Sequence, residues 1–433
     1  MKGYDRQMRT NESIKVPDST RAVMSLLEEA GFECFVVGGY LRDTLLGRPT
    51  FDIDLATSAT PEDVMRSLSR YLVIPTGLRH GTVTVLTKDG SIEITTFRED
   101  GMYSDFRHPD VVRYAKTIEE DLARRDFTIN ALAWNEKRGL IDPWDGQSDL
   151  KKGLIRTVGD ANQRFREDAL RILRGLRLSA ELSFQIEERT SDAMRSCAQL
   201  LKHVARERLQ VELNRLLIGE NALSVMQGYV DILSVVIPEL SILDDCAPSP
   251  LNVAFLRASS MGRDIPLRLA ALLCDLENAL EILKRLRYDN ATIDRVEKLI
   301  AFQSEKLFPE KRSVWRGLYR YGQKDFLDGM RLRVAGERAH ANIQGIVAPS
   351  APADTAVSPT TAAIAQIADD LIRRNRILEL KDLAVNGHDL LGRGYRGQEV
   401  GAMLEILLEK VCVDDFPNER ESLLAAIDSK SEN

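Results

Sequence analysis

Apolar and polar residues alternate over short stretches in the first third of the chain. Residues 34–37 form an apolar run, and residues 82–86 and 91–97 alternate around a Lys-Asp-Gly turn. A period of two residues is typical of strands. Apolar residues at helical spacing over 18–30, and again from Tyr40, predict helices between these strands. The first 150 residues therefore predict a small mixed sheet with helices.

Local signals predict further elements in the same region. Residues 51–56 read as another strand. Thr60 followed by Pro61 predicts a helix start, because Thr is a favoured N-cap and Pro is tolerated at the first helical position. We expect Asp18 or Ser19 to cap the 18–30 helix. The apolar run 131–134 predicts a short helix.

The pattern changes near residue 162 and stays helical to the end of the chain. It predicts one helix over 165–178 and an amphipathic helix over 199–217. Residues 346–363 are rich in Pro, Ala, Ser and Thr, a composition typical of linkers. Helices are expected to resume at about 364.

This order of elements predicts an α+β fold, with a small mixed-sheet head followed by an all-α neck, body and tail. We expect an N-terminal arm at 1–19, the head at 20–150, the neck at 151–219, the body at 220–345, the linker at 346–363 and the tail at 364–433.

Composition narrows the class of protein. The 433 residues are 44% hydrophobic and 29% charged, as in soluble globular proteins. No apolar run is long enough for a membrane span, and the first residues lack a secretory signal. The five cysteines are scattered without a Cys-x-x-Cys motif, so we expect reduced thiols in a cytoplasmic protein. The net charge of −7 disfavours a general nucleic-acid coat protein but leaves a local basic site open.

Candidate chemistry begins directly after the apolar run 34–37. Gly38 and Gly39 lie between the predicted strand and helix, where residues without a side chain let backbone N–H groups approach a phosphate. Arg42, one turn into the helix, can add a charge-assisted contact. A Gly-Gly pair alone is usually only a turn.

Two acidic residues follow on the strand 51–56. Asp52 and Asp54 are two positions apart, so their side chains project from one face. Neighbouring carboxylates repel unless a cation lies between them. Mg²⁺ is commonly bound by one or two carboxylates together with substrate phosphates, and it is the metal we expect here.

Together these residues resemble the signature Gly-Gly-x-x-Arg-Asp…Asp-x-Asp of the nucleotidyltransferase superfamily that includes tRNA CCA-adding enzymes and bacterial poly(A) polymerases. The resemblance is strong over residues 20–218 and moderate over 383–425, and it is to the class II tRNA nucleotidyltransferases. It implies a polymerase β-like head, two-metal nucleotidyl transfer and a tail that binds the tRNA elbow.

The resemblance assigns roles to residues that spacing leaves open. Glu93 alone reads as an ordinary exposed strand residue, but Ser-Ile-Glu-Ile-Thr-Thr-Phe-Arg matches the family segment that supplies a third catalytic carboxylate. The Arg-Arg-Asp-Phe-Thr-x-Asn-Ala pattern implies that Arg125, Asp126 and Asn130 contact the nucleotide sugar and phosphates. The polar segment 98–114 resembles the flexible loop of enzymes that add A.

The Glu-Asp-x-x-Arg motif implies that Asp168 and Arg171 read the base. A carboxylate accepts a hydrogen bond from the exocyclic amine of C or A, and a guanidinium donates to the ring nitrogen. G and U present the opposite polarity, so this protein edge selects C and A without a template. Glu167 can hold Arg171 by an i,i+4 pair. Arg174 and Arg177 continue the spacing and are expected to contact nucleotide or RNA phosphates.

The implied function is addition of CCA to the 3′ end of tRNA from CTP and ATP, by a monomer or homodimer without a membrane partner. The alternatives are the A-adding member of a split CC-adding and A-adding pair, a poly(A) polymerase, or an inactive RNA-binding module. Poly(A) polymerase is disfavoured because residues 75–83 lack the basic segment expected there. The intact Asp52 and Asp54 argue against an inactive module.

Overall fold

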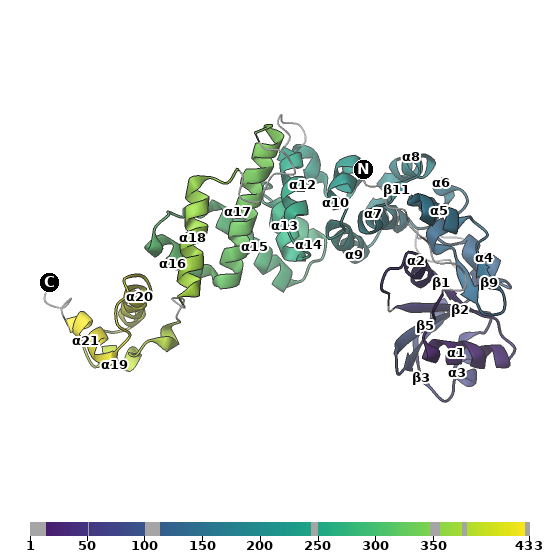
Figure 1. Cartoon of the computed structure of the whole chain (residues 1–433), viewed down its shortest axis with the longest axis horizontal. Coiled ribbons are helices and arrows are strands. Elements are labelled where there is room, and N and C mark those ends of the chain that lie inside the picture. The colour runs from purple at the N-terminus through teal and green to yellow at the C-terminus, as the bar shows by residue number, and fades with distance from the viewer. Residues whose placement is uncertain are drawn as a thin grey trace. The chain divides into compact units, whose positions relative to one another are not determined.

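The computed structural model describes residues 14–50, 52–99, 113–243, 250–346, 356–374 and 379–428. The chain divides into two compact units, Met1–Pro238 and Glu239–Asn433. Figure 1 shows the sheet in the first unit and helices throughout the second. No helix in these ranges is long and apolar enough to cross a membrane.

The first unit is built on a mixed seven-stranded sheet with the order β3-β4-β5-β2-β1-β8-β9. Strands β2 and β5 pair in parallel, and the other neighbours are antiparallel. The strands are β1 (Cys34–Val37), β2 (Ile53–Thr57), β3 (Leu72–Gly77), β4 (Thr82–Thr87), β5 (Gly90–Thr96), β8 (Ala133–Asn135) and β9 (Gly139–Ile141). The predicted mixed-sheet head is confirmed.

Short helices with clear start signals pack beside this sheet. The side chain of Thr60 accepts from the backbone N–H of Asp63 and Pro61 is the first residue of α3, as expected. Thr117 and Glu120 form a capping box at the start of α4. Figure 1 shows α1 and α3 side by side. The helices are α1 (Asp18–Glu29), α2 (Gly39–Leu45), α3 (Pro61–Ser67), α4 (Ile118–Ala123) and α5 (Gly146–Lys152).

Helices complete the first unit after the sheet. They are α6 (Ala161–Glu167), α7 (Leu170–Leu182), α8 (Glu188–Cys197), α9 (Arg206–Leu217), α10 (Ala222–Gly228) and α11 (Val230–Val236). A short parallel pair, β10 (Leu154–Ile155) and β11 (Gln185–Ile186), ties the start of this helical part to its middle. α7 packs against α9, and residues of both helices line the same cavity.

Two expectations from the sequence are wrong: the type of element at 131–134 and the residue that caps α1. The run 131–134 is not a helix: a 3-10 turn, Thr128–Asn130, leads into β8, which pairs with β1 and β9. Its conformation is set by these distant strands rather than by local propensity. Neither Asp18 nor Ser19 caps α1, because the cap position is Pro17 and its carbonyl accepts from Arg21 N.

Two expected helices are interrupted. The helix expected over 165–178 breaks at Asp168, whose backbone is extended (φ −141°) and whose carboxylate accepts from Leu170 N. An Asp side chain that bonds nearby backbone competes with the helix in this way. The helix expected over 199–217 divides into a 3-10 segment, Ala198–His203, and α9, because β-branched Val204 is extended.

The second unit is entirely helical in its described residues. Its helices are α12 (Pro250–Ser260), α13 (Ile265–Leu273), α14 (Ala279–Arg285), α15 (Asn290–Ser304), α16 (Lys311–Tyr321), α17 (Gln323–Ile343), α18 (Pro359–Arg373), α19 (Gly387–Leu391), α20 (Gln398–Val413) and α21 (Arg420–Asp428). Helix α18 begins inside the predicted linker, because Ser358 caps it and Glu337 accepts from Ser358 and Thr361. The division into body, linker and tail stays a prediction.

Candidate active site

A cavity of about 760 Å³ opens within the first unit, between the sheet and helices α7 and α9. Its lining includes nine arginines and eight carboxylates. This balance differs in sign from the net charge of −7 of the whole chain, so the cavity can accept an anionic ligand. Every site residue expected from sequence lines it except Glu167, which lies behind Arg171.

Gly38 brings the backbone close to a neighbouring guanidinium. Its φ is +70°, a conformation that residues with a side chain rarely adopt. A Cβ atom built on Gly38 would lie 3.1 Å from Nη1 of Arg125 and 4.0 Å from Oδ2 of Asp54. Glycine at this position therefore leaves open the space between the first strand and the acidic strand β2.

Arg42 is held from two sides within the cavity. Its Nε and Nη2 donate to the carboxylate of Asp43 at 3.1 and 2.8 Å, and its Nη1 donates to Oδ1 of Asn130 at 2.8 Å. Asn130 in turn donates to Oδ1 of Asp126 at 3.2 Å. The predicted phosphate ligand Arg42 is thus connected to the predicted sugar ligands of the Arg-Arg-Asp motif.

The candidate metal ligands lie just before β2, on β2 and on the neighbouring strand β5. Asp52 and Asp54 are exposed, and Asp54 is the register partner of Glu93 on the parallel strand β5. Loss of hydration in the cavity, followed by repulsion from Glu93, raises the pKa of Asp54 to about 6 against the opposing effect of Arg125. A bound cation would relieve this repulsion.

The donor set fits a metal that keeps substrate oxygens among its ligands. No cluster of three or more His, Cys, Asp or Glu side chains that could enclose a metal ion occurs in the described ranges. Mg²⁺ is typically bound through one or two carboxylates and substrate phosphates rather than by an all-protein cage. Asp52, just before β2, and Asp54 on β2 both line the cavity and match that requirement.

Asp121 fixes both arginines of the Arg-Arg-Asp motif. Its Oδ1 accepts from Arg124 (Nε 3.0 Å, Nη2 2.7 Å) and its Oδ2 accepts from Arg125 (Nε 3.3 Å, Nη2 2.9 Å). Burial of Asp121 opposes its ionisation, but the two guanidinium groups outweigh this and lower its pKa to about 2. Sequence analysis missed Asp121, although its i−3 and i−4 spacing from the arginines was a usable signal.

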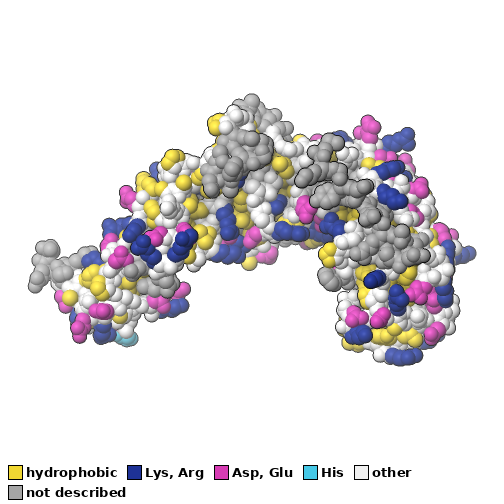
Figure 2. Space-filling model, in the orientation of Figure 1, with side chains coloured by type: hydrophobic (Ala, Val, Ile, Leu, Met, Phe, Trp, Pro, Cys, Tyr) yellow, Lys and Arg dark blue, Asp and Glu magenta, His cyan; other side chains and the backbone are white. Residues whose placement is uncertain are grey.

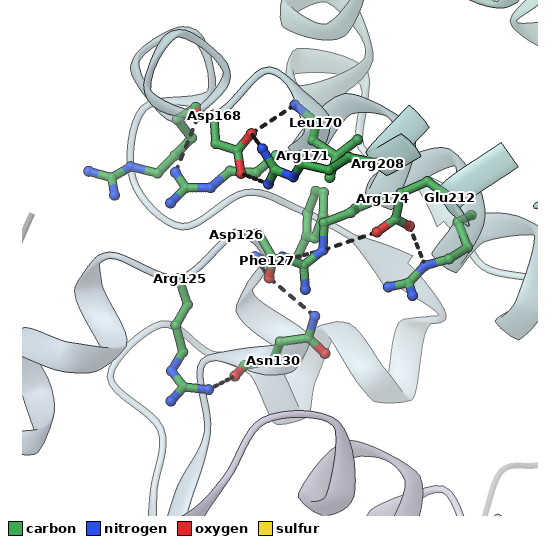
Figure 3. Close-up of polar contacts among 12 residues, drawn as sticks. Arg125, Asp126, Phe127, Asn130, Asp168, Leu170, Arg171, Arg174, Arg208 and Glu212 are labelled. Carbon is green, nitrogen blue, oxygen red and sulfur yellow. Dashed lines mark hydrogen bonds and ion pairs between the residues drawn. The ribbon is translucent and has the colours of Figure 1, made fainter. Parts of the chain in front are cut away.

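A row of alternating charges runs from the sheet into the helices (Figure 3). Asp126 pairs with Arg174 (3.3 Å), and Glu212 of α9 pairs with Arg177 (3.0 Å) and more distantly with Arg174 (3.9 Å). Although Asp126 is buried, Arg174 and Asn130 lower its pKa to about 2. Arg177 is only 6% exposed, so its guanidinium is committed mainly to carboxylates of the protein.

The expected base-reading pair lies where α6 gives way to α7. Arg171 Nη1 donates to Glu167 Oε2 at 2.8 Å and to the Arg164 carbonyl at 3.2 Å, and its Nη2 donates to the Arg124 carbonyl at 2.9 Å. The contact with Glu167 has the expected i,i+4 spacing. Figure 3 shows Asp168 and Arg171 near each other, with Arg208 beside Asp168.

Sequence analysis also missed two residues of α9: Arg208, which lines the cavity, and Glu212, which pairs with the lining residues Arg174 and Arg177. Arg208 binds the carboxylate of Asp168, forty residues away in sequence. No local pattern indicates such a pairing. Most of the expected mobile segment 98–114 lies outside the described residues, but its ends, β6 (Arg98–Glu99) and β7 (Arg113–Tyr114), pair as an antiparallel ribbon.

The mixed sheet, the paired carboxylates at the start of β2 and the arginine-lined cavity define a nucleotidyltransferase. Three family models match in order along the chain: Poly A polymerase head domain at 34–156, Probable RNA and SrmB-binding site of polymerase A at 183–243, and tRNA nucleotidyltransferase domain 2 at 267–427.

Comparison with whole proteins is more specific. The chain is 36% identical over 417 residues to a CCA-adding enzyme of Levilactobacillus brevis, covering 95% of this chain and 97% of that one. It is 36% identical over 415 residues to a CCA-adding enzyme of Limosilactobacillus fermentum, covering 94% and 96%. The crystal structure of the Bacillus stearothermophilus CCA-adding enzyme in complex with CTP is similar, with a TM-score of 0.74 and 29% identity over 96% of this chain and 97% of that one. The chain belongs to the family of CCA-adding enzymes, and the prediction of a tRNA nucleotidyltransferase is confirmed.

Proposed function

We propose that the cavity of the first unit is the centre for this chain's reaction, the template-independent addition of C, C and A to the 3′ end of tRNA from CTP and ATP. One observation carries the proposal. The same cavity is lined by the carboxylates of Asp52 and Asp54 and, across it, by the acceptor and donor pair Asp168 and Arg171. The first pair suits phosphoryl chemistry and the second suits recognition of C and A.

Nucleotidyltransferases of this kind normally use a divalent metal, and we propose Mg²⁺ at Asp52 and Asp54. Bound there, Mg²⁺ supplies Lewis-acid activation of the tRNA 3′-hydroxyl and neutralises charge on the triphosphate. Glu93 lies beside Asp54 in register and adds negative charge that favours cation binding. Gly38 keeps the approach to Asp54 free of side-chain atoms.

The triphosphate and sugar would lie between β1 and the Arg-Arg-Asp motif. Gly38 and Gly39 allow close approach of phosphate to the backbone. Arg125, oriented by Asp121, supplies positive charge next to Asp54. We assign contacts with the sugar and phosphates to Arg125, Asp126 and Asn130, and a further phosphate contact to Arg42.

Asp168 and Arg171 would read the base, with Glu167 orienting Arg171. Arg174 has a side chain 39% exposed and faces the cavity, which suits it to a phosphate contact. Arg177 is buried against Glu212, so we assign it to support of the cavity wall rather than to direct phosphate binding.

The tRNA body would dock outside the cavity, with the tail 364–433 as the proposed elbow-binding part. On the face drawn in Figure 2, lysine and arginine side chains are interspersed with carboxylates. Docking would therefore depend on local basic groups rather than on a uniformly basic face.

The four described cysteines are free, which fits a cytoplasmic enzyme. One copy supplies every group named here, so the proposal is met by a monomer or by each subunit of a homodimer.

The decisive experiment supplies CTP and ATP, separately and together, to tRNA that ends before its CCA and to tRNA that ends in CC. We expect two C residues from CTP alone and complete CCA from both nucleotides. Addition of A only to tRNA ending in CC, with no use of CTP, would instead identify the A-adding member of a split pair.

A further inference from the structure

Arg208 holds the carboxylate of Asp168 with two parallel hydrogen bonds. Its Nη2 donates to Oδ2 at 2.8 Å and its Nη1 donates to Oδ1 at 3.4 Å. The two side chains are 26% and 15% exposed, so the pair is partly shielded from water. Two-pronged arginine–carboxylate contacts fix geometry as well as charge.

These contacts limit what Asp168 can still accept. A carboxylate offers about four acceptor positions, two on each oxygen. On Oδ1, Leu170 N (3.1 Å) and Arg208 Nη1 take both. On Oδ2, Arg208 Nη2 takes one. Among the described residues, one acceptor position therefore remains, on Oδ2, and it suits a single N–H donor.

Contacts with the protein also limit what Arg171 can still donate. A guanidinium has five N–H donors. Both donors of Nη1 and one of Nη2 bind Glu167, the Arg164 carbonyl and the Arg124 carbonyl. Within the described part of the chain, Nε–H and the second Nη2–H remain. These two donors can meet acceptors such as the ring nitrogen and O2 of C.

We propose that Arg208 is a positioning residue for base selection: it fixes the Asp168 carboxylate so that one acceptor faces the exocyclic amine of the incoming base. This inference rests on the proposed role of Asp168. With Arg208 in place, a carbonyl such as O4 of U or O6 of G meets only an acceptor. Without Arg208, the carboxylate can rotate away and lose its control over that position.

The geometry also explains why an arginine is required. Lysine offers a point charge and cannot bind both carboxylate oxygens in one plane. Arg208→Lys should preserve the charge and much of the stability while losing the fixed orientation. In this variant, base selectivity should therefore fall while the folding stability stays close to that of the wild type.

The experiment compares Arg208→Ala, Arg208→Lys and Asp168→Asn with the full-length enzyme. Arg195→Ala is the matched control, because Arg195 pairs with Asp231 in the same helical part and does not line the cavity. Each protein is given CTP, ATP, UTP or GTP alone with tRNA ending before its CCA. kcat and KM are measured for each nucleotide, together with the thermal unfolding midpoint.

We expect Arg208→Ala to reduce the preference for CTP over UTP by about tenfold, the effect of one charge-assisted hydrogen bond. Arg208→Lys should lose a similar part of that preference while unfolding near the wild-type temperature. Arg195→Ala should keep the wild-type preference. In an Asp168→Asn background, Arg208→Ala should have little further effect on selectivity.

Two outcomes would overturn the inference, and they differ in what else they overturn. If Asp168→Asn relaxes selectivity but both Arg208 variants keep the wild-type ratio, Arg208 is not a positioning residue and the proposed function stands. If Asp168→Asn itself leaves the ratio unchanged, the base-reading role fails and this inference fails with it.

Discussion

Asp54 on β2 and Glu93 on β5 face each other in register on parallel neighbouring strands. Repulsion between the two carboxylates contributes to the raised pKa of Asp54. A divalent cation bound at this site would offset the repulsion and stabilise the ionised form of both carboxylates.

Substitution of the candidate metal ligands gives the first prediction. Asp52→Ala or Asp54→Ala should abolish nucleotide transfer in Mg²⁺ while tRNA binding persists, because the tail-docking surface is untouched. Asp89→Ala, an exposed carboxylate on the β4–β5 turn outside the cavity, is the control and should behave as wild type. Near wild-type turnover of either β2 variant would remove the metal assignment.

A pair of glycine substitutions separates backbone strain from blockage of the site. Gly38→Ala and Gly31→Ala both place a side chain at positive φ, which costs about 1–3 kcal/mol of stability. The added Cβ meets Arg125 at 3.1 Å only in the first variant, because Gly31 has open space around it. We therefore expect both variants to lose stability but a raised KM for CTP only in Gly38→Ala. Equal kinetics in the two variants would contradict the close-approach role of Gly38.

Reversal of the base-reading edge gives a third prediction. The double variant Asp168→Arg with Arg171→Asp should shift use toward UTP and GTP by at least about tenfold, because each charged hydrogen bond contributes about 1.5–3 kcal/mol. The new charges would face Arg208 and Glu167, so the overall rate should fall. Adding Arg208→Glu supplies the new arginine with a partner and should restore part of the rate. An active double variant with the wild-type preference for CTP and ATP would show that these residues do not read the base.

Asp121 predicts a defined loss of stability in acid. Its pKa in the folded state, about 2, lies below the ordinary 3.8, so folding favours the ionised form. The resulting stabilisation, about 2 kcal/mol, is present above about pH 4 and is lost as the pH falls toward 2. Asp121→Asn should lose it at neutral pH and show a flatter acid profile in thermal unfolding. Asp231→Asn, which alters an exposed ion pair, should change stability by less than about 1 kcal/mol. Parallel acid profiles for wild type and Asp121→Asn would contradict this account.

Affinity for tRNA should fall steeply with salt. Phosphate contacts release counterions, so the Kd should rise several-fold between low and physiological salt despite the net charge of −7. The measurement is equilibrium binding of tRNA across a salt series. A Kd that stays constant would argue against docking dominated by phosphates.

The sequence allowed prediction of elements whose causes are local. Thr60 and Pro61 set the start of α3 within a few residues, and alternation set β4 and β5. The run 131–134 misled because its strand conformation depends on β1, about one hundred residues earlier. The break at Asp168 was missed because apolar spacing continues across it, while the side-chain bond that stops the helix leaves no trace in that spacing.

The site residues that belong to short local motifs could be predicted from the sequence. Arg208 and Glu212 were missed because their partners are distant in sequence: Asp168 lies between α6 and α7, and Arg174 and Arg177 lie on α7. Only the packing of α7 on α9 brings them together. Residues that share a strand face or a helix turn can be recognised from their spacing in one sequence. Residues brought together only by tertiary contact cannot.

Arg171 takes two of its three acceptors from backbone carbonyls, those of Arg164 and Arg124. A carbonyl oxygen persists when its own side chain is replaced. Mutations at positions 124 and 164 can therefore accumulate without moving the guanidinium, provided that the local backbone is kept. The proposed contact of Arg171 with the base therefore depends on the backbone more than on these two side chains, and sequences that differ at both positions can share it.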